Sequence, residues 1–155
     1  MRWLLLAMLL VAPAWAELSV EHQGKVLVSF DVPGLEESGR RDGKNSRITY
    51  TRSVEDGTLQ VTVNVRRWIG IDINKQYYKD RDSRRENPHS RLVQDIEVAG
   101  TKRALAYRTS EPFDGYTLVL YTDDFRCEFL ITGSKQAASA IEPTFNQLLK
   151  SVKIH

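Results

Sequence analysis

Strict alternation of apolar and polar residues is the feature that most limits how this chain can fold. The clearest case runs from Leu59 to Trp68, where every second residue up to Val65 is apolar and the residues between are polar. Side chains of a strand point alternately to its two faces, so this segment predicts a strand with one buried face. Residues 25–32 repeat the pattern with three valines and a phenylalanine. Such strands favour an antiparallel sheet with its core on one side.

Turn residues divide much of the remaining chain into further strands. Asp56-Gly57 predicts a hairpin turn between a strand over residues 47–53 and the strand that begins at Leu59. Residues 35–47 follow Pro33-Gly34, are polar and contain glycine, so they are expected to form a loop. Ala99-Gly100, Asp114-Gly115 and Asp123-Asp124 separate four later strands, predicted over residues 92–98, 102–109, 116–122 and 126–132.

Two segments change to the helical period. Asp72 is placed to cap a helix that runs to about Arg84, with Ile73 and Tyr77 one turn apart on its inner face, and Asn87-Pro88 ends it. A second helix begins between Gln136 and Pro143 and has an apolar stripe. The residues of that stripe are Ile141, Phe145, Leu148 and Val152.

The start of the second helix is open between two positions. Ser139 with Glu142 three residues later fits a capping box. Glu142-Pro143 fits a later start, with a cap followed by proline at the first helical position.

The first sixteen residues, MRWLLLAMLLVAPAWA, have the form of a secretory signal peptide. Arg2 gives the positive start, residues 4–11 the apolar run, and Ala14-Trp15-Ala16 the cleavage site. A membrane anchor would need about 20 apolar residues, and here Glu17 ends a shorter run. We therefore expect cleavage after Ala16 and a periplasmic or secreted protein. Residues 17–155 then form a single α+β domain, an antiparallel β-sheet flanked by helices.

The end of the chain resembles one known family. Val98-Ala99-Gly100 after a strand, and the run from Phe145 to Ile154 (FNQLLKSVKI), are similar to the PsbP-like fold family, whose members end in a helix of this form. The resemblance implies an α/β/α sandwich, in a superfamily used mostly for binding and assembly. Members include photosystem accessory subunits, a nuclear-transport regulator and bacterial chaperones for secreted effectors. The family has no shared catalytic motif, so no residue inherits a role.

The sequence contains no recognisable catalytic motif. Nucleophilic catalysis needs a hydroxyl or thiol with a base, and the histidines are His22, His89 and His155. His22 lies at the end of an early strand and His155 is the last residue, which are poor places for an ordered base. His89 lies in a loop, and no Gly-x-Ser-x-Gly elbow is present. We expect no catalytic residues and no cofactor, although an enzyme with an unrecognised site near His89 stays open.

Two further groups have a structural and a functional interpretation. The single cysteine, Cys127, lies on an apolar strand face and is expected to be a small buried residue, with pairing between chains as the alternative. Asp80, Asp82 and Glu86 could hold a hard cation, but they lack the spacing of a calcium loop. Their basic neighbours favour a salt-bridged helix surface, so we expect no metal site.

The middle of the chain carries a basic and aromatic patch. Residues 38–91 hold 13 basic and 7 acidic side chains. Arginine forks bind oxyanions and aromatic rings stack on guanidinium groups, so this patch suits an acidic partner. The alternative for the charged residues is a solvated surface without a partner. The alternative for Trp68 and Tyr77 is that their rings cover the sheet. The candidate binding residues are Arg66, Arg67, Trp68, Tyr78, Arg81, Arg84 and Arg85, with Tyr77 and Lys79 beside them and Arg40, Arg41, Lys44 and Arg47 from the preceding loop.

These observations favour a non-enzymatic binding or assembly module of the bacterial envelope. Its expected partner is a protein or another anionic ligand; nucleic acid is disfavoured because the chain is exported and has no nucleic-acid motif. No segment after residue 16 is expected to span a membrane. A secreted effector that acts on host surfaces through the basic patch is the alternative.

Overall fold

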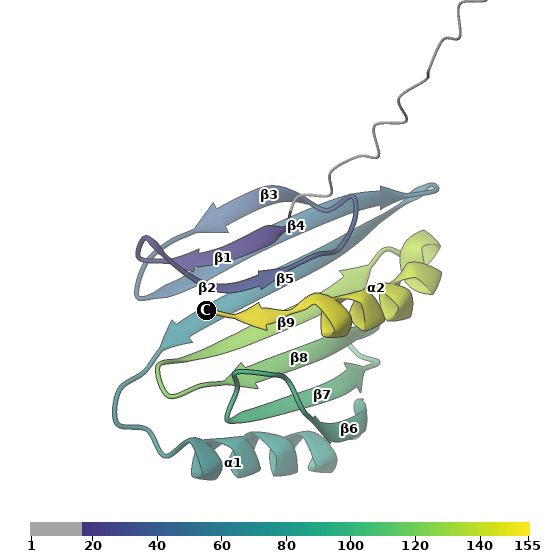
Figure 1. Cartoon of the computed structure of the whole chain (residues 1–155). Coiled ribbons are helices and arrows are strands. Elements are labelled where there is room, and N and C mark those ends of the chain that lie inside the picture. The colour runs from purple at the N-terminus through teal and green to yellow at the C-terminus, as the bar shows by residue number, and fades with distance from the viewer. Residues whose placement is uncertain (1–16) are drawn as a thin grey trace, which may run out of the picture.

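The structure, a computed structural model, describes residues 17–155 and contains two antiparallel sheets and two long helices (Figure 1). The α+β class predicted from the sequence is confirmed. The predicted signal peptide lies outside the described residues. No helix within residues 17–155 has the length and apolar character needed to cross a bilayer.

The larger sheet has seven strands in the order β3-β4-β5-β9-β8-β7-β6, all antiparallel. The strand from Gly57 to Arg67 lies near its centre and has the predicted buried face. The bounds are β3 (Glu36–Arg41), β4 (Asn45–Val54), β5 (Gly57–Arg67), β6 (Ser90–Ile96), β7 (Arg103–Thr109), β8 (Gly115–Tyr121) and β9 (Phe125–Gly133).

A small sheet and the second helix cover one face of the large sheet. The small sheet has the order β1-β2-β10, from strands at both ends of the described chain. Its bounds are β1 (Leu18–His22), β2 (Lys25–Phe30) and β10 (Lys153–Ile154). Helix α2 (Ala138–Ser151) lies beside it and buries Ile141, Phe145 and Leu148 in the main core. Burial of these three residues confirms most of the predicted stripe; its fourth member, Val152, is the C-cap of α2 and is partly buried.

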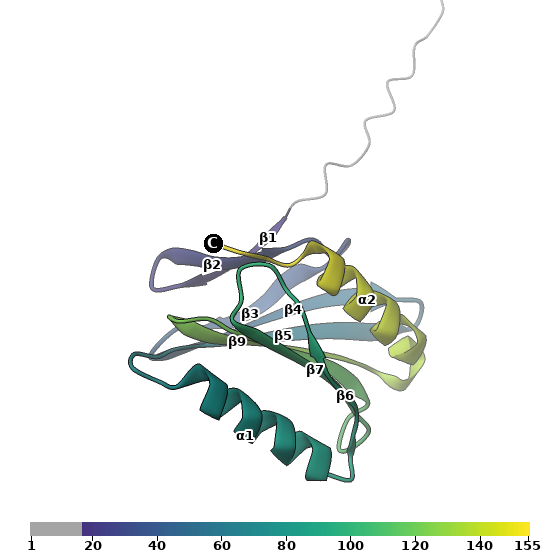
Figure 2. The ribbon, with the colours of Figure 1, turned by 60° about the horizontal axis from the view of Figure 1, so that its bottom comes forward.

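Helix α1 (Ile73–Glu86) packs on the opposite face, so the large sheet lies between α1 on one side and α2 with the small sheet on the other (Figure 2). A second core lies beneath α1 and contains six buried side chains. They are Trp68, Tyr77, Leu105, Tyr107, Val119 and Tyr121. The predicted cap is present, because the Asp72 carboxylate accepts a hydrogen bond from the backbone N–H of Lys75 at 3.0 Å.

The prediction of a loop over residues 35–47 is wrong. Residues Glu36–Arg41 form edge strand β3, which pairs with β4 from Glu36 opposite Thr51 to Arg41 opposite Arg47. All six residues of β3 are exposed. A strand without a buried face has no apolar alternation, so its sequence resembles that of a loop. Charged side chains also protect such an edge from pairing with other chains.

The second helix begins inside the predicted range from Gln136 to Pro143, but neither of the two predicted caps is observed. A short 3₁₀ turn (Lys135–Ala137) leads into α2, which begins at Ala138 with Ala137 as its N-cap and no capping side chain. Pro143 therefore lies inside the helix. Proline there lacks one backbone donor, and burial of the apolar stripe offsets that loss.

Candidate functional site

Helix α1 leaves half of its face of the large sheet uncovered. The second core involves β6, β7, β8 and the end of β5, whereas the corresponding face of β4, β5 and β9 carries polar residues. Arg47, Asn64 and Glu128 lie in one cross-strand row, and Asn45, Arg66 and Arg126 lie in the next. Residues opposite each other in an antiparallel pair share a face, so three arginines meet on this open surface.

A groove of about 550 Å³ lies at the end of this surface, beside the turn between β3 and β4. Five basic residues line it, and the polar Asn64 lies among them. The five are Arg41, Lys44, Arg47, Arg66 and Arg126. A smaller crevice of about 120 Å³ between α1 and the sheet shares Arg126 with the groove. The groove is therefore a concave basic surface built by β3, β4, β5 and β9.

Arg126 differs from the other four basic residues because it has acidic partners. Its guanidinium lies 3.0 Å from Glu128 Oε2 and 3.4 Å from Asp80 Oδ2. Burial opposes its charged form, but Glu128, Tyr121 and Asp80 outweigh that effect and raise the pKa of Arg126. Asp80 also accepts a hydrogen bond from the Tyr121 hydroxyl, which fixes α1 to the sheet.

The other four basic side chains of the groove form no ion pair with any residue in the range 17–155. They are Arg41, Lys44, Arg47 and Arg66. Arg66 also lies directly across the strand pair from Arg126. Like charges in that position repel each other. Asp42 is the one acidic residue among the described residues that line the groove, so five basic side chains face a single carboxylate there.

The structure distributes the predicted patch over several surfaces. Trp68 and Tyr77 are 7% and 1% exposed and fill the core beneath α1, which is the packing interpretation. Trp68 donates its indole N–H to the Thr122 carbonyl at 3.0 Å. Arg66 lies in the groove, whereas Arg67 is the next strand residue and points to the opposite face.

The helix members of the predicted patch are largely engaged with other side chains. The Arg81 guanidinium lies 4.7 Å from the Tyr78 ring centre and 3.0 Å from Asp82 Oδ1. That of Arg84 lies 4.8 Å from the Tyr107 ring centre. Arg85 and Lys79 are exposed and form no ion pair within residues 17–155. Of the arginines first singled out on β5 and α1, only Arg66 lines the basic groove.

His22 is more ordered than its position in the sequence suggested. It is 1% exposed, and its Nδ1 lies 2.7 Å from Ser46 Oγ, which in turn donates to Asp42 Oδ1 at 3.3 Å. Ser46 is itself 2% exposed, so its hydroxyl is closed to a substrate. The chain of contacts ties the turn that borders the groove to the small sheet. The two partners are 24 residues apart, and only the fold brings them together.

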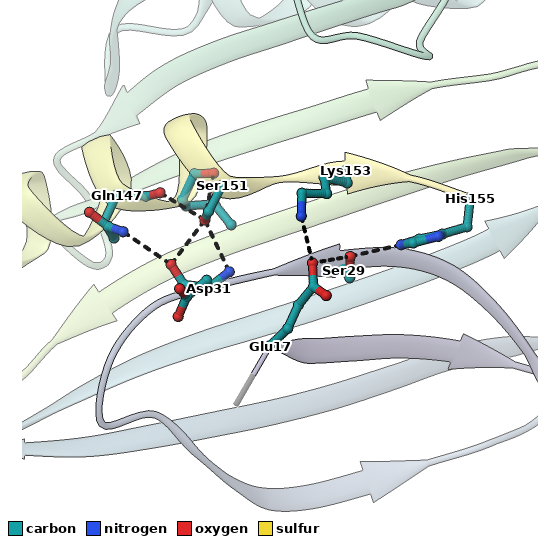
Figure 3. Close-up of polar contacts among 8 residues, drawn as sticks. Glu17, Ser29, Asp31, Gln147, Ser151, Lys153 and His155 are labelled. Carbon is teal, nitrogen blue, oxygen red and sulfur yellow. Dashed lines mark hydrogen bonds and ion pairs between the residues drawn. The ribbon is translucent and has the colours of Figure 1, made fainter. Parts of the chain in front are cut away.

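A second serine and histidine meet where the two ends of the described chain lie side by side (Figure 3). Ser29 Oγ lies 2.7 Å from His155 Nε2 and donates to Glu17 Oε1 at 2.8 Å. The carboxylate contacts the serine and not the imidazole, so this differs from a catalytic triad, in which the acid orients the histidine. Hydrogen bonding from Ser29, and then from Lys153, lowers the pKa of Glu17.

The remaining residues with a proposed chemical role lie apart from the groove. His89 is in an exposed loop with its Nδ1 3.4 Å from Glu111 Oε2. No cluster of three metal-ligating side chains is found within residues 17–155. Cys127 is fully buried, which confirms the predicted packing role, and burial raises the pKa of its thiol.

No family model, no curated protein and no solved structure matches this chain.

Proposed function

We propose that this protein is an exported, non-enzymatic binding or assembly module of the bacterial envelope, and that it receives an acidic segment of a protein partner in the basic groove. The observation that carries the proposal is one concave surface lined by four cations that form no ion pair within residues 17–155. They come from the end of β3, the following turn, β4 and β5: Arg41, Lys44, Arg47 and Arg66.

The side chains of the groove are suited to binding the carboxylate groups of an extended acidic peptide. Arg47 and Arg66 lie on neighbouring strands in adjacent rows, which places their Cβ atoms within about 8 Å of each other. Guanidinium groups bind carboxylates through two parallel hydrogen bonds, and Asn64, in the same row as Arg47, adds an amide donor and acceptor. An acidic segment would supply the missing negative charge and relieve the repulsion between Arg66 and Arg126.

Two sequence observations support export and family. Residues 1–16 have the form of a signal peptide. The resemblance of residues 145–154 to the PsbP-like family implies an α/β/α sandwich used for binding. The helices on both faces of the antiparallel sheet support this part of the proposal.

The test measures binding of a fluorescent poly-glutamate peptide by anisotropy. We expect the triple variant Arg41→Glu, Arg47→Glu and Arg66→Glu to weaken binding by about tenfold or more, because all three cations face the ligand. Binding to the unchanged protein should also weaken at about 1 M salt, where the screening length is only about 3 Å.

The matched control reverses the same number of charges on α1, as Arg81→Glu, Arg84→Glu and Arg85→Glu. These residues lie outside the groove, so binding is expected to stay within about twofold of the unchanged protein. Loss of binding in the helix variant alone would move the site to the patch first predicted on α1. Binding that survives in both variants and is insensitive to salt would overturn the proposal.

A further inference from the structure

The loop between β5 and α1 presents an isoleucine almost entirely to solvent. Ile69 is 97% exposed, the highest value among the large exposed apolar residues, and Ile71 is 38% exposed. Gly70 between them has a φ of +68°, a left-handed conformation that suits glycine and turns the chain back towards α1. A side chain with such exposure touches almost nothing of its own chain, so Ile69 projects from the tip of a convex turn.

Both ends of this loop are fixed to the rest of the fold. Trp68 is buried, with its indole N–H on the Thr122 carbonyl and its backbone N–H on the Asp124 carbonyl at 3.1 Å. Asp72 caps α1 through the backbone N–H of Lys75. The loop forms one end of the molecule in both views of the ribbon (Figures 1 and 2). Ile69 is therefore held outwards by its anchors at a point where a flat surface can reach it.

Basic residues flank the exposed isoleucines. Arg67 precedes them and Lys75 follows them, and neither forms an ion pair within residues 17–155. The Asp72 carboxylate is occupied by the helix cap. In the neighbouring turn between β8 and β9, Asp123 is paired with Lys102 at 3.4 Å. The loop thus combines a projecting apolar tip with two cations, Arg67 and Lys75, that form no ion pair within residues 17–155. The carboxylates beside them are that of Asp72, which caps the helix, and that of the exposed Asp124 in the neighbouring turn.

We propose that this loop docks the protein on the surface of an anionic bilayer, with Ile69 inserted among the lipid chains and Arg67 and Lys75 at the headgroup phosphates. A single convex apolar tip suits a deformable lipid surface, because a protein partner would have to offer a matching pocket. The flanking cations supply charge complementarity to anionic headgroups. One inserted side chain gives weak, reversible binding that needs this electrostatic contribution. The proposal does not depend on the basic groove.

The experiment measures partition onto lipid vesicles. It uses residues 17–155, which hold every described strand and helix and both cores, so that the apolar run of residues 1–16 is absent. The protein should sediment with vesicles rich in phosphatidylglycerol and not with pure phosphatidylcholine. Ile69→Ser should lower the partition coefficient by about tenfold, as expected for loss of one buried aliphatic side chain.

Phe113→Ser is the matched control. Phe113 is also a large exposed apolar residue, at 69%, but it lies in the turn between β7 and β8, at the opposite end of the strands. Its replacement should leave partition within about twofold of the unchanged protein. Both variants change an exposed side chain, so neither should affect folding, and both should keep their affinity for poly-glutamate. The poly-glutamate measurement therefore distinguishes failure of the membrane-docking proposal from failure of the proposed function of the groove.

Insertion is read directly with an environment-sensitive fluorophore on Ile69→Cys. Cys127 is fully buried, so the new thiol is the accessible one in the folded protein. We expect a blue shift on anionic vesicles for the label at residue 69 and none for the label on Phe113→Cys. Equal partition onto neutral and anionic vesicles, absence of the shift, or unchanged partition of Ile69→Ser would each overturn the proposal. Cross-linking of residue 69 to a protein without vesicle binding would assign the loop to a protein partner.

Discussion

Glu17 shows how a single exposed carboxylate can join distant parts of this chain. Its Oε1 accepts from Ser29 Oγ at 2.8 Å and lies 3.2 Å from Lys153 Nζ (Figure 3). Ser29 also contacts His155. These contacts favour the ionised carboxylate, and that is why the pKa of Glu17 lies below its ordinary value of 4.5. Folding and ionisation of Glu17 are therefore coupled.

The coupling predicts a pH-dependent contribution to stability. A carboxylate whose pKa is lowered by folding stabilises the folded state above its unfolded pKa and loses that effect as pH falls through the folded value. We expect Glu17→Gln to have a slightly lower Tm than the unchanged protein at pH 7, with the difference shrinking as pH falls below 4.5 and vanishing once pH lies below the lowered pKa of Glu17 in the folded protein. Thermal unfolding followed by circular dichroism at both pH values measures it.

Glu86→Gln is the control, because the Glu86 side chain is exposed and forms no hydrogen bond or ion pair within the described chain. Its Tm should match that of the unchanged protein at both pH values. A gap between Glu17→Gln and the unchanged protein that persists unaltered in acid would contradict the assigned role of the carboxylate.

At the scale of elements, α2 owes its place to one apolar stripe. The Phe145 ring is 4% exposed and stacks on Tyr116 of β8 with 4.8 Å between ring centres. Phe145→Ala is expected to lower the free energy of unfolding by about 3–5 kcal/mol, the usual cost of removing a buried aromatic ring. Urea denaturation measures the change.

The neighbouring residue provides the matched control, since Asn146 is exposed on the same helix. Asn146→Ala should change the free energy of unfolding by no more than about 0.5 kcal/mol. Equal stability of Phe145→Ala and Asn146→Ala would mean that α2 does not depend on the stripe for its packing.

Most elements with one buried face could be predicted from the sequence, and β6 was expected over residues 92–98 although none of its residues is buried. β5 was predicted because burial of its valines imposes a period of two, and the Asp72 cap because its chemistry is local. β3 was missed because all of its residues are exposed. β10 has only two residues, and pairs with β2 across more than a hundred positions. Non-local pairing of so short a segment leaves no local pattern.

The candidate site was predictable in composition but not in shape. Arg41, Lys44, Arg47 and Arg66 all belonged to the basic region recognised in the sequence. Their meeting depends on the pairing of β3, β4 and β5, which also brings in Arg126 from a strand 60 positions later than Arg66. Helix α1 carries many basic residues, yet it turns several of them onto aromatic rings. The number of basic residues in a segment cannot show whether they line an open groove or pack on aromatic rings.

At the scale of the whole molecule, the large sheet separates two different surfaces. One face is closed by α2 and the small sheet, and the other is only half covered by α1. The basic groove lies in the uncovered half, and the Ile69 loop lies at the end of β5. The end of β5 therefore contributes to both candidate contact regions. Arg66 faces the groove, and Arg67 lies at the base of the Ile69 loop.

Glu17 and His155 both contact Ser29, so the two ends of the described chain lie close enough for a circular permutation of the protein. A flexible linker of about six residues can join the two ends, and closing so short a loop costs little entropy. New ends can be opened at the exposed turn that carries Phe113. We expect this circularly permuted protein to show the circular dichroism spectrum and the single cooperative unfolding transition of the unpermuted one. Loss of cooperative unfolding would show that folding requires the native order of strands, in addition to the surfaces that they bury.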